Sequence, residues 1–198
     1  GIFTGVIMAA LREKLIAGRT VGMFIDFQFE DMEAMYPKMR LEEEGAKVIV
    51  IGAHDKGMKY TGKYGYPLKS DATVKDVDAA SLDALVIPGG FAPDYLRRNT
   101  AMLDLILAVA GAGKPVAAVC HGPWMFCSAR RADGKPVIEG RKATGFVAIK
   151  DDLINAGAVW VDEPVVIDGP YITSRTPSDL VPFCHAIIDE TVKAASRP

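Results

Sequence analysis

The chain has 198 residues, of which 49% are hydrophobic, so it is long enough to form one domain whose core needs no metal or disulfide. A formal net charge of -2 and the lack of a Lys/Arg-rich run argue against a nucleic-acid partner. The three cysteines are widely spaced and form neither a disulfide framework nor a CxxC pair, so we expect a cytoplasmic protein.

The first 18 residues are expected to form a separate N-terminal extension. Residues 2–11 are apolar but too few to span a bilayer, so we expect no membrane partner. Arg12, Glu13 and Lys14 follow the apolar run, which is the reverse of the order in a secretory signal. We therefore predict an amphipathic helix over residues 2–17 that packs on the domain or on a partner subunit.

From residue 19 to residue 198, apolar runs alternate with helical patterns in what we expect to be a single domain. Strands are predicted at residues 20–26, 46–52, 84–87, 115–119, 142–144, 165–167 and 171–173. Helices are predicted at residues 31–44, 100–112 and 149–156, and from residues 121 and 178 onwards. Residues 53–77 are rich in glycine and are expected to be irregular, as a hairpin or an excursion from the sheet.

This alternation predicts an α/β, three-layer sandwich with a mostly parallel central sheet. In such folds the functional site lies at the carboxyl ends of the strands. That rule selects three segments, residues 27–30, 88–92 and 120–123.

Cys120 directly follows one predicted strand and directly precedes a predicted helix. A tight turn there lifts a side chain above the sheet, as in the nucleophile elbow of hydrolases. The helix N-terminus favours a thiolate over a thiol, so we expect a lowered thiol pKa. A buried structural cysteine is the alternative, and it is the role we expect for Cys127 and Cys184.

Backbone groups around this turn are candidates for binding the substrate. Gly122 leaves space where a substrate approaches, and the N–H groups near His121, Gly89 and Gly90 are suited to form an oxyanion hole. These glycines match neither a phosphate loop nor the GxGxxG pattern. The three scattered histidines lack carboxylates at ligand spacing, so neither a metal nor a cofactor is expected.

Two ionisable side chains are candidates for proton transfer beside Cys120. A protonated Glu30 is suited to donate a hydrogen bond to the thiolate, and His121 adjoins the nucleophile in sequence. The alternatives are an exposed acid at a helix N-terminus for Glu30 and a histidine satisfied elsewhere for His121. We expect Asp31 to cap the helix and Glu33 to be an ordinary acid on its face.

Several motifs resemble the ThiJ/PfpI superfamily, in its PfpI-type branch of intracellular proteases, glyoxalases and deglycases. They are Phe29-Glu30-Asp31-x-Glu33-x-x-Tyr36-Pro37, Thr61-Gly62-Lys63-x-Gly65-Tyr66, Asp83-Ala84-Leu85-Val86-Ile87-Pro88-Gly89-Gly90-x-Ala92-Pro93-Asp94, Ala118-Val119-Cys120-His121-Gly122-Pro123, Asn155-Ala156-Gly157-Ala158 and Thr173-Ser174-Arg175-Thr176-Pro177-x-Asp179-Leu180. The resemblance covers residues 19–190.

The resemblance implies a flavodoxin-like, class I glutamine amidotransferase-like fold. It implies Cys120 as nucleophile, Glu30 as its carboxyl partner and His121 as a site residue. It also implies a homodimer that often assembles into a hexamer. Activities of the group are divided among cysteine peptidase, glutathione-independent glyoxalase, deglycase, and stress protection or holdase.

One departure from the group's pattern decides which functional hypothesis we rank first. Members regarded as peptidases carry a glutamate directly after the asparagine that matches Asn99, whereas this chain has Thr100. Because threonine cannot orient an imidazolium by charge, we place a reaction on small reactive carbonyls, of the methylglyoxal-to-lactate type, above peptide or amide hydrolysis. A non-enzymatic redox sensor or holdase is the third hypothesis, since a reactive thiol is readily oxidised.

Overall fold

The computed structural model describes residues 13–198, and its centre is a seven-stranded sheet with the strand order β10-β11-β7-β6-β1-β2-β5. Its strands are β1 (Thr20–Phe24), β2 (Lys47–Gly52), β5 (Ala72–Thr73), β6 (Ala84–Ile87), β7 (Val116–Val119), β10 (Val165–Asp168) and β11 (Tyr171–Ser174). Neighbouring strands are parallel except for β10 and β11, which form an antiparallel pair at one edge. The predicted α/β fold with a mostly parallel sheet is confirmed.

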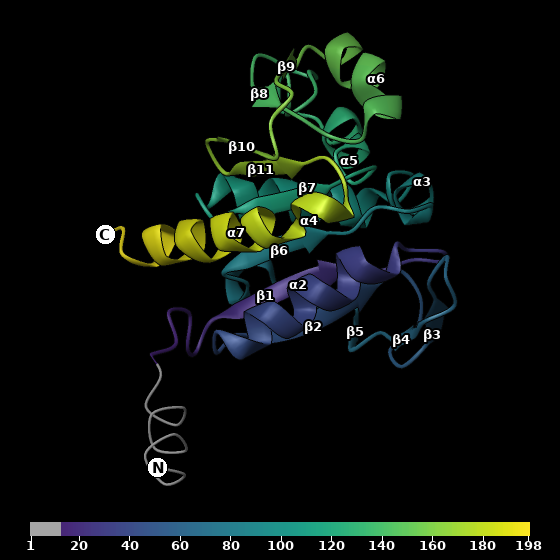
Figure 1. Cartoon of the computed structure of the whole chain (residues 1–198), viewed down its shortest axis with the longest axis vertical. Coiled ribbons are helices and arrows are strands. Elements are labelled where there is room, and N and C mark those ends of the chain that lie inside the picture. Colours follow the sequence, from purple (N-terminus) through teal and green to yellow (C-terminus); the bar gives the residue numbers. More distant parts are fainter. Residues whose placement is uncertain (1–12) are drawn as a thin grey trace, which may run out of the picture.

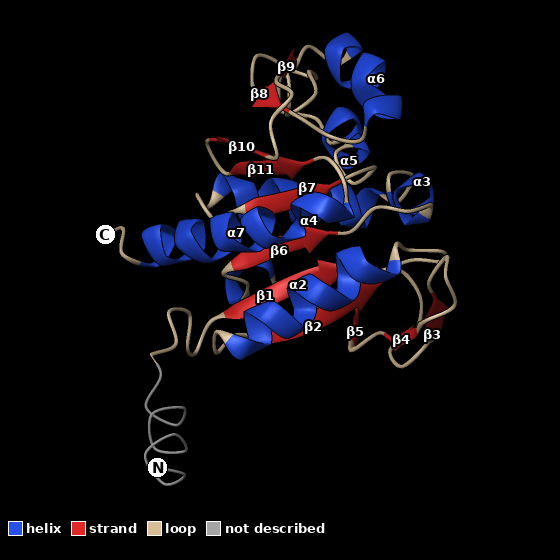
Figure 2. Ribbon diagram, viewed as in Figure 1, coloured by secondary structure: helices blue, strands red, loops and turns tan. Residues whose placement is uncertain are grey.

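Helices cover both faces of this sheet. Figures 1 and 2 show α2 (Asp31–Glu43) and α7 (Leu180–Ala195) over one face, with α4 (Thr100–Gly111) behind the sheet. The strands β6 and β7 lie in the middle and are fully buried, which explains their uninterrupted apolar sequences. The result is the three-layer sandwich expected from the alternation of elements.

Shorter helices and strands lie around the carboxyl end of the sheet. They are the hairpin of β3 (Lys59–Thr61) and β4 (Pro67–Lys69), the helices α3 (Ala92–Leu96), α5 (Trp124–Ser128) and α6 (Lys150–Asn155), and the parallel pair of β8 (Lys142–Ala143) and β9 (Val159–Trp160). Single 3-10 turns lie at Val74–Asp76, Ala79–Ser81, Val147–Ile149 and Pro177–Asp179. Residues 53–77 thus contain a hairpin, which was one of the expected forms, and also the edge strand β5, which was not expected.

The start of the described chain differs from the sequence-based expectation. Residues 2–12 of the predicted helix lie outside the described residues. Residues 13–17 are not helical and enter a turn in which the Ile16 N–H donates to the Glu44 carbonyl at 3.2 Å. Ile16 is buried there against the end of α2, so packing has fixed a turn where an isolated apolar pattern predicted a helix. The domain boundary at residue 18 stays a prediction.

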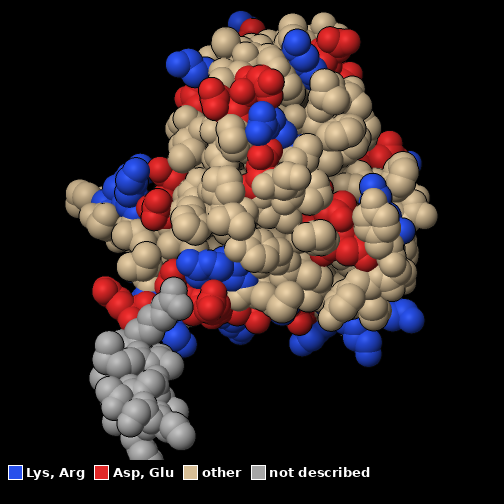
Figure 3. Space-filling view, viewed as in Figure 1, with Lys and Arg blue, Asp and Glu red and all other residues tan. Residues whose placement is uncertain are grey.

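Charge is distributed over the face of the molecule shown in Figure 3 without a patch of one sign. Residues 13–198 contain no helix that is long and apolar enough to cross a membrane. Figure 3 shows Lys and Arg side chains interspersed with Asp and Glu on the face viewed. This mixed surface agrees with the small net charge of the sequence.

Candidate active site

A strained turn presents Cys120 at the carboxyl end of β7. The residue has φ +62°, a left-handed conformation that non-glycine residues rarely adopt. Two backbone hydrogen bonds hold it: the Cys120 N–H donates to the Ser174 carbonyl at 3.0 Å, and the Phe146 N–H donates to the Cys120 carbonyl at 2.8 Å. Strain that is fixed by its surroundings in this way is typical of functional sites. The geometry is that of a nucleophile elbow.

The structure brings His121 to the thiol. Its Nδ1 atom lies 3.3 Å from the Cys120 Sγ atom. The imidazole packs against the rings of Phe146 and Trp124, with centroid distances of 5.0 and 5.3 Å. Burial lowers the pKa of His121, and the charge of Lys63 lowers it further. The imidazole is therefore neutral at pH 7 and can take the thiol proton.

Glu33 is the acid that reaches Cys120, and the sequence-based reasoning missed it. The residue lies on the inner face of α2 and is completely buried, and its Oε1 atom accepts a hydrogen bond from the Gly89 N–H at 2.8 Å. Its Oε2 atom has no hydrogen-bond partner of ordinary geometry among the described residues. The carboxyl nevertheless lies close enough to the Cys120 thiol for each group to shift the pKa of the other.

Burial raises the pKa of Glu33 to about 8, and the neighbouring charge of Glu30 adds to the effect. At neutral pH the Glu33 carboxyl is therefore mostly protonated. A protonated carboxyl has an O–H group to donate, whereas a carboxylate only accepts. Glu33 can thus stabilise a Cys120 thiolate by a hydrogen bond without bringing a second negative charge into the site.

Glu30 and Asp31 have other partners than those expected. Glu30 is the N-cap of α2, and its Oε2 atom accepts a hydrogen bond from the Glu33 N–H at 2.9 Å. Asp31 accepts from the N–H groups of Tyr64 and Tyr66 at 2.9 and 2.8 Å. The predictions of Asp31 as the cap and of Glu33 as an ordinary surface acid were therefore wrong. A catalytic role for Glu30 stays a prediction, but Glu33 is the residue beside the thiol.

The expectation of an acidic thiol is also corrected. Burial raises the pKa of the Cys120 thiol above its ordinary value, and negative charge on Glu33 raises it further. The His121 backbone N–H and the Lys63 ammonium act in the opposite direction. The helix that follows, α5, has only five residues and therefore contributes a small dipole. Protonation of Glu33 is thus the change that eases formation of the thiolate.

The three glycines expected at the oxyanion hole or the substrate site have different hydrogen-bond partners. The N–H groups of Gly89 and Gly122 already donate, to Glu33 Oε1 and to the Val119 carbonyl. For the Gly90 N–H, no acceptor is found within residues 13–198. A Cβ atom on Gly89 would lie 2.6 Å from Glu33 Oε1 and 2.9 Å from the His121 nitrogen, so this position requires glycine. The oxyanion role stays a prediction, now with Gly90 as the N–H group best suited.

The remaining candidate residues lie apart from the nucleophile. Cys127 and Cys184 are buried, and burial raises the thiol pKa to about 11 for Cys127 and about 12 for Cys184. His54 packs on Phe27 and lines a cavity of about 490 Å³ together with Thr100. Within the described part of the chain, no cluster of three or more His, Cys, Asp or Glu side chains is arranged to hold a metal.

Comparison with known proteins identifies the family. Residues 19–190 match the model of the DJ-1/PfpI family. The chain belongs to this family. It is 45% identical over 161 residues to the protein named Deglycase PfpI of Pyrococcus furiosus, which covers 81% of this chain and 92% of that protein. The resemblance stated from the motifs is thereby confirmed.

Two further DJ-1/PfpI relatives carry different descriptions. A Bacillus subtilis protein whose name marks it as a candidate cysteine protease, YraA, is 39% identical over 165 residues, or 83% of this chain and 94% of that protein. A two-domain protein of Anabaena variabilis, with DJ-1/ThiJ/PfpI-like and ferritin-like domains, has a TM-score of 0.83 and 39% identity. The match covers 91% of this chain and 50% of the two-domain chain.

We expect the substitution Glu33→Gln to lower the pKa of the Cys120 thiol. The amide keeps a hydrogen-bond donor beside the sulfur but cannot become negative, so the charge that opposes the thiolate above pH 8 is removed. The measurement is the pH dependence of iodoacetamide labelling of Cys120, read by mass spectrometry. Glu43→Gln, a neutralised exposed acid on the same helix, is the matched control. An unchanged or higher thiol pKa in Glu33→Gln would contradict the assignment.

Proposed function

We propose that this protein is a cysteine-dependent, cofactor-free enzyme of the glyoxalase and deglycase type, which acts on small reactive carbonyls in stress protection. One observation carries the proposal: the Cys120 thiol has both the neutral imidazole of His121 and the buried acid Glu33 as neighbours. This arrangement supplies a nucleophile, a base and an acid, which are the groups needed to add a thiol to an aldehyde and move a proton.

The reaction begins when His121 takes the thiol proton and the Cys120 sulfur attacks the aldehyde carbon of methylglyoxal. The resulting alkoxide gains a proton and becomes a hemithioacetal. His121, which is neutral again after giving the thiol proton to this alkoxide, removes the proton from the former aldehyde carbon and returns it to the neighbouring carbon through an enediol. The product is a lactoyl thioester on Cys120, and water hydrolyses it to lactate and the free thiol.

The same steps act on an adduct of methylglyoxal with an amine. Attack by Cys120 on the adduct carbon displaces the amine, and the bound three-carbon unit leaves again as lactate. This reading is supported by the names of the archaeal relatives, such as the deglycase of Pyrococcus furiosus at 45% identity. The strained turn at Cys120 supports it as well, because it holds the sulfur at the edge of the sheet.

Cys120→Ala is expected to abolish consumption of methylglyoxal and formation of lactate, with at least a roughly hundred-fold loss of kcat, because no other described thiol adjoins a base. Lactate release by the purified protein is the quantity to measure. Cys127→Ala serves as the matched control and is expected to keep its activity. Turnover by Cys120→Ala at the parent rate would end the proposal.

Peptide hydrolysis through an acyl-enzyme is the second candidate. The distance of 3.3 Å between Cys120 Sγ and His121 Nδ1 favours it, and the name of YraA is consistent with it. However, no carboxylate orients His121 within the described residues, since its ring contacts are Trp124 and Phe146. We therefore expect a panel of fluorogenic peptides to show no cleavage that Cys120→Ala removes. Cysteine-dependent cleavage would reverse the order of the two candidates.

The structure supports a redox-sensor role less well than either enzymatic role. Cys120 is only 8% exposed, and burial raises the pKa of its thiol. Sulfenic acid forms most readily on exposed cysteines of low pKa.

We further propose that the protein forms a homo-oligomer through the outer face of α2. Met32 and Met39 are more than half exposed there, and Tyr66 from the β3–β4 loop extends the same apolar surface. Contiguous exposed apolar surface of this kind marks association sites. Light scattering at micromolar protein is expected to give at least the mass of a dimer, and the double substitution Met32→Glu, Met39→Glu to reduce it. A monomeric parent would contradict this surface assignment.

A further inference from the structure

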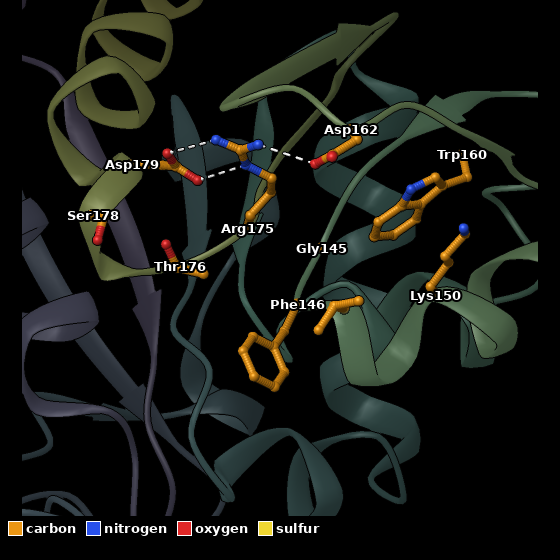
Figure 4. A pocket seen from close by; sticks show the side chains of 10 residues that line it. Gly145, Phe146, Lys150, Trp160, Asp162, Arg175, Thr176, Ser178 and Asp179 are labelled. Carbon is orange, nitrogen blue, oxygen red and sulfur yellow. Dashed lines mark hydrogen bonds and ion pairs between the residues drawn. The ribbon is translucent and has the colours of Figure 1, made fainter.

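A cavity lies next to the residues that hold the Cys120 turn, on the β11 side of the sheet. This cavity has a volume of about 380 Å³ and lies between Phe146, Trp160 and Arg175, as Figure 4 shows. Two of its walls are connected directly to the backbone of Cys120. Phe146 donates its N–H to the Cys120 carbonyl, and Arg175 follows Ser174, whose carbonyl accepts the Cys120 N–H. The Phe146 ring also packs on the His121 imidazole, with 5.0 Å between centroids, so one wall of the cavity contacts the histidine beside the thiol.

The acids of the cavity are already paired. The Arg175 guanidinium donates to both carboxylate oxygens of Asp179 at 2.9 and 3.1 Å, and to Asp162 at 3.0 Å. Figure 4 shows Arg175 between these two carboxylates. The bidentate geometry with Asp179 fixes the guanidinium, so Arg175 serves as the counter-ion of the acids. It is not free to receive a negatively charged ligand.

Lys150 is different because it has no acidic partner. Among the described residues that line the cavity, it is the one cation with no carboxylate within 4.0 Å. Its ammonium lies 5.9 Å from the centre of the Trp160 ring, and Figure 4 shows the two side chains next to each other. Lys150 is the first residue of the short helix α6 and lies about one helical turn after Phe146. Its ammonium is therefore well placed to bind an anion that enters the cavity.

We infer that this cavity is a binding subsite for the non-reacting part of the substrate, and that Lys150 recognises a carboxylate there. The inference rests on the proposed carbonyl chemistry and narrows its substrate class. Phe146, Val147 and Trp160 provide apolar and aromatic walls for a hydrocarbon chain. The preferred substrates are then small carbonyl adducts whose leaving part carries a free carboxylate, such as adducts of single amino acids. Residues within a protein chain lack that carboxylate.

The test compares two adducts that differ only in this group. Hemithioacetals of methylglyoxal with N-acetylcysteine and with N-acetylcysteinamide have the same reacting carbon, but only the first has a carboxylate. We expect the parent to show a kcat/KM at least about ten-fold higher for the carboxylate adduct, which is the size of one charge-assisted hydrogen bond. Methylglyoxal alone, measured in parallel, gives the rate due to free aldehyde.

Lys150→Gln is expected to remove this preference by raising KM for the carboxylate adduct, with kcat and the rate on methylglyoxal unchanged. Lys150→Arg keeps the charge and is expected to retain the preference. Lys75→Gln, a neutralised exposed lysine outside the cavity, is the matched control. Equal kcat/KM values for the two adducts in the parent, or an unchanged preference in Lys150→Gln, would overturn the inference.

A binding measurement keeps the subsite separate from the proposed activity. Calorimetric titration with N-acetylmethionine and its amide needs no turnover. Binding of the carboxylate form by the parent, lost in Lys150→Gln, supports the subsite even if methylglyoxal is not consumed. Turnover of methylglyoxal without any carboxylate preference or binding refutes the subsite and leaves the proposed function in place.

Discussion

The buried carboxyl of Glu33 is the interaction on which the site depends. Its Oε1 atom accepts the N–H of Gly89, which fixes the loop after β6 against α2. The same side chain adjoins the Cys120 thiol, so α2, the β6 loop and the β7 turn meet at one acid. A charged carboxylate at a fully buried position is costly. The cost is avoided by keeping the proton, and that proton is what the thiol chemistry needs.

The fold could be read from the sequence because its signals are local and repeated. The strand runs of β6 and β7 are uniformly apolar, and parallel topology follows from the helices between them. Cys120 could be found for the same reason, since it lies at the junction of a strand and a helix. The residue with φ +62° confirms that the chain turns sharply there.

Glu33 and Lys63 could not be assigned from the same patterns, since their roles depend on which faces meet in three dimensions. One available signal was overlooked: Glu33, Pro37 and Leu41 follow one another at intervals of four residues, and all three lie on the buried face of α2. Lys63 acts from the β3–β4 loop, far from Cys120 in sequence. The predicted direction of the shift in the Cys120 thiol pKa was wrong because the prediction considered the helix dipole but not the burial of the sulfur. Burial has the larger effect on this pKa.

Phe146 has a consequence for how this enzyme can change over evolutionary time. Its backbone holds the nucleophile turn, its ring supports His121, and its side chain is a wall of the neighbouring cavity. A substitution there alters reactivity and substrate fit together, so selection cannot adjust one without the other. Diversification of substrate range therefore has to proceed through cavity residues such as Lys150 and Trp160, whose side chains make no contact with Cys120 or His121 among the described interactions.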